Sequence, residues 1–280
     1  MLRSLSLVML LTIGLFAAIP AAADGVIVNT GNPDGLIAMA ARPESPGKVE
    51  IEAADDFILS GSTNVTGGSF VGLLPSGASI SQVVVEIYRV FPKDSTDPPS
   101  GNVLTRVNSP SDVAFDSRDS STGSLKFTTT PGGTFTANNS VLNGINKKPN
   151  QFTGGEGAVT GEKVSFDVTF TTPFDLPADH YFFVPQVLLT SGDFFWLSAP
   201  KPIVPPGTPF PPGFTDLQTW MRNGDLDPDW SRVGTDITNQ GPFNGTFTLS
   251  GSPTPEPSTL LLLGSGLLAL VGLTLKKAIA

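Results

Sequence analysis

Residues 162–172, EKVSFDVTFTT, decide the fold class. The stretch alternates apolar and polar side chains, and its apolar set is Val164, Phe166, Val168 and Phe170. A period of two places these side chains on one face of an extended chain and the polar ones on the other. The segment is therefore predicted to be a β-strand with one face on a core and one face in water.

Similar runs predict further strands along the chain. They lie at residues 49–59, 64–74, 82–91, 125–130, 181–189, 194–198 and 246–250. The runs 82–91 and 181–189 are apolar on both faces, which is typical of central strands. Residues 216–222 have a helical pattern that Asp216 can cap, and residues 92–161 are expected to form long surface loops.

The fold class that follows is all-β. Short strands with frequent turn formers, 30 glycines and 26 prolines in 280 residues, predict a single antiparallel β-sandwich, jelly-roll-like in topology. This domain is expected to span residues 24–252, preceded by a leader at 1–23 and followed by a tail at 253–280.

Composition excludes several kinds of function. The chain has no cysteine and one histidine, His180, so disulfides, zinc–thiolate sites and multi-histidine metal centres are excluded. Twenty-five acidic residues against 16 basic ones give a net charge of −9, which repels phosphate backbones. Nucleic acid is therefore not an expected partner.

Residues 1–23 read as a secretory signal peptide. Arg3 precedes an apolar run, and the segment ends in Pro20-Ala21-Ala22-Ala23, a small-residue cleavage site. Cleavage between Ala23 and Asp24 is expected, with an uncleaved membrane anchor as the alternative.

Residues 260–275 are predicted to form a transmembrane helix. The run is free of charge, and with Ser258 and Thr259 it would extend about 27 Å, enough to cross a thin bilayer core. Lys276 and Lys277 follow it and act as a stop-transfer signal. Because positive residues stay inside, the body is expected to lie outside the cytoplasm.

Pro255-Glu256-Pro257, the following Ser258-Thr259, the apolar run and the short basic end together resemble the PEP-CTERM sorting signal. The resemblance implies recognition and processing by an exosortase, and export in a bacterium that makes exopolysaccharide or biofilm matrix. Tails of this family often end in several arginines, whereas this one ends in two lysines and Ala278-Ile279-Ala280. A plain C-terminal membrane anchor is the alternative.

Two ligand sites are candidates within the body. Asp225, Asp227, Asp229 and Asp236 follow the spacing of ligands 1, 3, 5 and 12 of a calcium loop, although Trp230 stands where such a loop has glycine. The alternative is a solvated acidic turn, and no other cofactor is expected. Trp220 and Trp230 flank this loop and are the candidate platform for stacking on sugar rings, with packing as the alternative.

No catalytic constellation is evident. His180 is interpreted as a surface residue at a strand edge, and Asp179 beside it should point to the opposite face. The sequence therefore predicts a non-enzymatic, structural or adhesive protein. It is first anchored in the inner membrane and then located at the outer surface or in the matrix. Its expected partners are the secretion machinery, the exosortase and exopolysaccharide; a secreted hydrolase of matrix polysaccharide is the alternative.

Overall fold

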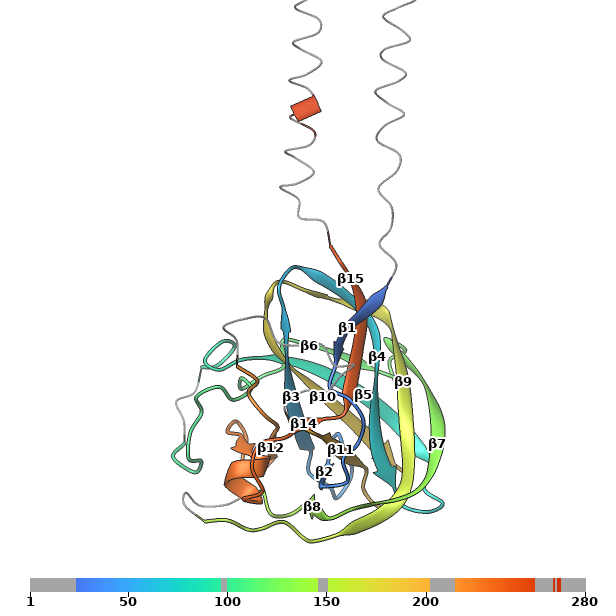
Figure 1. The fold of residues 1–280 in the computed structure, drawn as a ribbon, viewed down its shortest axis with the longest axis vertical. Coiled ribbons are helices and arrows are strands. Elements are labelled where there is room, and N and C mark those ends of the chain that lie inside the picture. The colour runs from blue at the N-terminus through green and yellow to red at the C-terminus, as the bar shows by residue number, and fades with distance from the viewer. Residues whose placement is uncertain are drawn as a thin grey trace, which may run out of the picture.

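The computed structural model describes residues 24–96, 100–145, 151–201 and 215–254, together with tail residues 264, 266 and 267. In these ranges the chain forms fifteen strands in two sheets and one π-helical turn, η2 (Val233–Ile237). The prediction of an all-β body is confirmed (Figure 1). The leader, most of the tail and the proline-rich residues 202–214 lie outside the described residues.

The larger sheet has nine strands: β1 (Gly25–Asn29), β2 (Ile37–Ala40), β4 (Thr63–Leu74), β7 (Leu125–Ala137), β8 (Asn139–Val141), β9 (Val159–Leu176), β11 (Phe195–Ala199), β14 (Asn244–Gly245) and β15 (Phe247–Pro253). The smaller has six: β3 (Ile51–Leu59), β5 (Ile80–Arg89), β6 (Asp116–Asp119), β10 (Asp179–Leu189), β12 (Trp220–Asn223) and β13 (Ser231–Arg232).

The two sheets share one aromatic core. The ring of Phe183 on β10 lies 4.9 Å from that of Phe247 on β15 and 6.3 Å from that of Phe70 on β4. Phe70 in turn stacks on Phe166 of β9 at 4.8 Å, so the predicted inward face of 162–172 is buried as expected. These contacts hold the nine-stranded sheet against the six-stranded one.

The six-stranded sheet is covered on its other face as well. Phe182 and Val184 alternate with Phe183 along β10 and pack in a second core with Trp220 and Trp230. The segment before β6, which includes Ala114, and the segments around β12 and β13, which include Leu217 and Trp230, supply this cover. Strand β10 lies between β3 and β5, which confirms that its two apolar faces mark a central strand.

Three expectations about the body are wrong. The helix expected at 216–222 is not formed. Trp220–Asn223 is strand β12, which pairs with β3 and so buries the neighbouring side chains of Trp220 and Met221 on opposite faces of the sheet. The region 92–161 holds more sheet than expected, since β7 continues beyond the predicted 125–130 to Ala137 and pairs with β9 on both sides of an irregularity between Pro131 and Thr134; threonine suits a strand. The sheet is not wholly antiparallel, because β2 and β8 pair in parallel.

The first and last strands of the body lie side by side (Figure 1). Gly25 of β1 is the register partner of Gly251 of β15, and the Thr254 amide donates to the Ser62 carbonyl at 2.8 Å. Asp24 and Thr254 therefore leave the body at the same end. Among the residues that the structure describes, no helix has the length and apolar character needed to cross a membrane.

Gly72 is a point where β4 tolerates no side chain. A Cβ there would lie 2.1 Å from Cε2 of buried Phe194 and 2.7 Å from the Phe195 carbonyl oxygen. We expect Gly72→Ala to lower the free energy of unfolding by about 1–3 kcal/mol through overpacking, measured by urea unfolding. Gly61→Ala is the matched control, since nothing lies within 4 Å of its Cβ position; equal stability losses would contradict this account.

Candidate functional site

A partly buried cluster of carboxylates lies on the covered face of the six-stranded sheet. Register places Glu52 of β3 beside Arg222 of β12, and Glu86 and Tyr88 lie two residues apart on β5, so they share a face. Glu50 precedes β3 and joins them. One carboxylate oxygen from each of Glu50, Glu52 and Glu86 lies within 4.8 Å of the other two.

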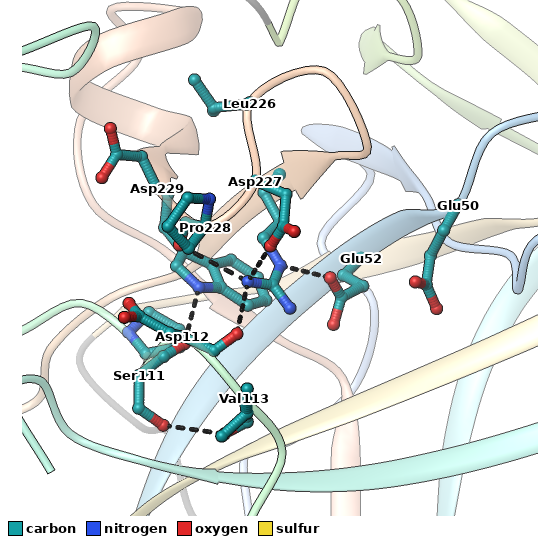
Figure 2. A network of polar contacts seen from close by, with 12 residues as sticks. Glu50, Glu52, Ser111, Asp112, Val113, Leu226, Asp227, Pro228 and Asp229 are labelled. Atoms are coloured by element: carbon teal, nitrogen blue, oxygen red, sulfur yellow. Dashed lines mark hydrogen bonds and ion pairs between the residues drawn. The ribbon is translucent and has the colours of Figure 1, made fainter. Parts of the chain in front are cut away.

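Hydrogen bonds hold the cluster in place. The Tyr88 hydroxyl is 2.6 Å from Oε1 of Glu52 and 3.2 Å from Oε2 of Glu86. Nε2 of Gln186 donates to Oε1 of Glu50 at 2.8 Å. Glu50 and Glu52 lie side by side at the edge of the network in Figure 2.

Arg222 supplies the positive charge that faces the cluster. Its Nε donates to Oε2 of Glu52, and its Nη1 lies 2.7 Å from Oδ1 of Asp227. Nη1 also donates to the Asp112 carbonyl at 2.9 Å, and the guanidinium carbon lies 4.4 Å from the centroid of Trp230. One side chain thus ties β3 to both covering segments (Figure 2).

Burial changes the protonation of this cluster. Desolvation, with the charges of Glu52 and Glu50, raises the pKa of Glu86 to about 8. Desolvation and the charge of Glu52 also raise the pKa of Glu50. Burial and the charges of Glu52 and Glu86 raise the pKa of the Tyr88 hydroxyl. At neutral pH the Glu86 carboxyl therefore keeps its proton in the folded protein.

Three carboxylates around one guanidinium can do two things chemically. They can hold a proton at neutral pH, as Glu86 does. Their oxygens are also the hard ligands that Ca²⁺ takes, and of the His, Asp and Glu groups in the described part of the chain these three form the one set close enough to hold an ion. All three already accept hydrogen bonds from Arg222, Tyr88 or Gln186.

The predicted calcium loop is not assembled. Asp229 is 0% exposed and accepts a hydrogen bond from Nη1 of Arg106 at 2.9 Å. Asp236 accepts a hydrogen bond from Nη2 of Arg232 at 2.7 Å. Asp227 forms an ion pair with Arg222. Each carboxylate is therefore neutralised by a different arginine. Asp225 is not drawn into a common site with them, so the prediction for these four residues is wrong.

The predicted sugar platform is also wrong. Trp220 and Trp230 are 1% and 0% exposed, and their indole N–H groups donate to the carbonyls of Leu217 and Ser111, each at 3.1 Å. Buried tryptophan needs such a partner. Both rings form the second core instead of a surface for stacking.

His180 is the second residue of β10, a central strand of the smaller sheet, and its side chain is only 16% exposed. Its Nε2 is 2.5 Å from Oδ2 of buried Asp56, whose Oδ1 accepts from the Leu217 amide at 2.9 Å. Asp179 pairs with Lys93 instead. The interpretation of His180 as a surface residue is therefore wrong, and its contact is with a carboxylate of the neighbouring strand.

Sequence reasoning missed the glutamate cluster, although a signal for it exists. Glu52 and Glu86 are charged residues within runs that are largely apolar and read as buried strands, IEAADDFIL and ISQVVVEIYR. A buried charge needs a partner of opposite charge. Each of these glutamates therefore indicates that a positively charged side chain lies nearby in the fold. What the sequence does not supply is the strand order that brings Arg222 beside them.

The comparisons with known proteins bear on the tail. Residues 253–277 match the PEP-CTERM protein-sorting motif, which confirms the resemblance found in the sequence. No curated protein and no solved structure matches the chain. The motif indicates an exported protein that is sorted by an exosortase.

The pKa of Glu86 predicts a pH dependence of stability. Its value rises from 4.5 in the unfolded chain to about 8 in the folded protein, so between these values the folded state binds more protons. The free energy of unfolding should therefore fall as pH rises from about 5 to 8, by at most about 1.4 kcal/mol per pH unit, and level off above.

Glu86→Gln should flatten this slope in urea unfolding at pH 5, 6, 7 and 8. The matched control is Glu44→Gln, a change at an exposed glutamate that should keep the wild-type slope. A wild-type stability that rises through this window in step with both variants would contradict the assignment.

Removing Arg222 should expose how much the cluster depends on it. Arg222→Met leaves Glu52 buried without its cation, and we expect a loss of about 3–5 kcal/mol in the free energy of unfolding. Adding Glu52→Gln should recover part of that loss. Lys93→Met, which breaks a surface ion pair, should cost no more than about 1 kcal/mol; equal losses at the two sites would contradict the account.

Proposed function

We propose that this chain is an exported bacterial protein whose β-sheet body serves as a structural or adhesive component of the cell surface or exopolysaccharide matrix. The observation that carries the proposal is the PEP-CTERM motif at residues 253–277. In this proposal residues 1–23 are a cleaved signal peptide, residues 260–275 cross the membrane, and Lys276 and Lys277 stop transfer. The body then folds outside the cytoplasm as a jelly-roll-like sandwich.

The arrangement of the termini supports this topology. Asp24 and Thr254 leave the body at the same end, because β1 and β15 are neighbours. A leader and a tail that both meet one membrane need their attachment points on one side of the domain. The fold provides that side without any long connection.

The surface supports a hydrophilic polymer as partner. Across the nine-stranded sheet, Thr128, Asp167, Ser69 and Thr248 follow one another in register on adjacent strands. Thr128 and Asp167 are exposed and the other two partly so. Short hydroxyl and carboxylate groups on a broad sheet face can hydrogen-bond to the hydroxyls of a polysaccharide, whereas stacking on Trp220 or Trp230 is excluded by their burial.

A non-enzymatic role is part of the proposal, with a secreted polysaccharide hydrolase as the alternative. Glycosidases place two carboxyl groups about 5 Å or more apart across the scissile bond. One oxygen of each of the glutamates that converge here lies within 4.8 Å of the other two, which does not separate them from such a pair, but all three carboxylates already accept bonds from Arg222, Tyr88 or Gln186. These internal bonds favour a structural role for them.

Intact-mass measurement tests the proposal. Protein recovered from the membrane fraction of the producing bacterium should start at Asp24, and protein in the matrix or medium should also have lost the tail. Replacing Pro255, Glu256 and Pro257 by alanine should keep the tail attached and the protein in the membrane. A wild-type protein that keeps residues 276–280 in every fraction would overturn the sorting proposal.

A further inference from the structure

The sorting motif and the folded sheet overlap. The match begins at Pro253, which is also the last residue of β15 and the register partner of Thr63 on β4. Thr254, the second residue of the match, donates its amide to the Ser62 carbonyl at 2.8 Å. The first two residues of the motif are therefore part of the body.

Strand β15 has no free edge along most of its length. It pairs with β4 on one side and with β1 on the other, where Gly25 faces Gly251. The fit is close at this point, because a Cβ on Gly251 would lie 2.1 Å from the Asn64 carbonyl oxygen. The backbone that leads into the motif is thus held on both sides.

Only five residues, 255–259, separate Thr254 from the apolar run that begins at Leu260. Fully extended, they span about 17 Å. A protease binds its substrate as an extended chain and hydrogen-bonds to its backbone, in the manner of an added strand. Backbone groups already paired within a sheet are not available for such contacts.

We propose that residues 252–254 at the end of β15 must separate from β4 before the sorting enzyme can act on the tail, so that this pairing controls the rate of tail removal. The inference rests on the proposed function and adds to it a regulatory step. The tail is removed by hydrolysis. One peptide bond breaks and one water is consumed, so that the body gains a C-terminal carboxylate and the tail gains an N-terminal amine. The mass of the released body checks this balance.

A disulfide can test the separation cleanly because the chain has no cysteine. Ser252 and Asn64 are register partners, and facing positions of an antiparallel pair are close enough for a disulfide. The full-length Asn64→Cys/Ser252→Cys variant is placed in membranes that contain the sorting enzyme. Tail removal is then timed by mass spectrometry, before and after reduction.

We expect the oxidised variant to lose its tail at least tenfold more slowly than the same protein after reduction. The matched control is Thr136→Cys/Thr160→Cys, which links β7 to β9 at another register pair and should be processed equally in both redox states. Inserting Gly-Ser-Gly-Ser between Thr254 and Pro255 should restore the rate of the oxidised variant, since the motif then gains free chain beyond the sheet.

Equal rates for the oxidised and reduced forms of the first variant would overturn this inference and leave the sorting proposal intact. Failure of the wild-type chain to lose its tail at all would be a different result, because it would overturn the proposed function and this inference with it.

Discussion

Strand β10 carries apolar side chains on both faces, and this constraint organises the body. Phe183 faces the nine-stranded sheet, whereas Phe182 and Val184 face the other way. Leaving the second set in water would cost about 1.5–3 kcal/mol for each large side chain. The chain therefore covers both faces, one with a second sheet and the other with the segments that carry Trp220 and Trp230.

Covering a sheet face with irregular chain creates an electrostatic problem, because the covering segments are acidic. Arginine side chains neutralise these buried carboxylates. Arg106 binds Asp112 and Asp229, Arg222 binds Glu52, and Arg232 binds Asp236. Arginine suits this position since its fork makes several bonds while remaining charged under burial. The pattern that resembles a calcium loop in the sequence is thus explained by internal ion pairs.

How much of this was predictable depends on how local the signal is. The strand at 162–172 and the central position of 181–189 follow from alternation and apolar content alone, and both are found in β9 and β10. The sorting motif is a contiguous signal, so it too can be read from the sequence. All eight strand ranges predicted from sequence runs begin within three residues of an observed strand start.

The predictions that failed concern features that depend on contacts between residues far apart in the sequence. Residues 216–222 have a helical pattern, but Trp220–Asn223 pairs with the edge of β3 and forms a strand instead. Here tertiary context overrides helix propensity. Trp220 and Trp230 are buried in a second core, and no local sequence pattern predicts that this core exists. The same holds for Glu86, whose pKa is raised by burial and by the charge of Glu52, which lies on another strand 34 positions away along the chain.

The ends of the body show how fold and export constrain each other. In the proposed topology, a tail that begins directly after β15 turns that end of the domain toward the membrane, and the pairing of β1 with β15 places the N-terminal residue of the body at the same end. The covered face with its glutamate cluster belongs to the other sheet. Sorting chemistry at the tail can therefore proceed without disturbing the buried ion pairs, provided that only the last residues of β15 come free.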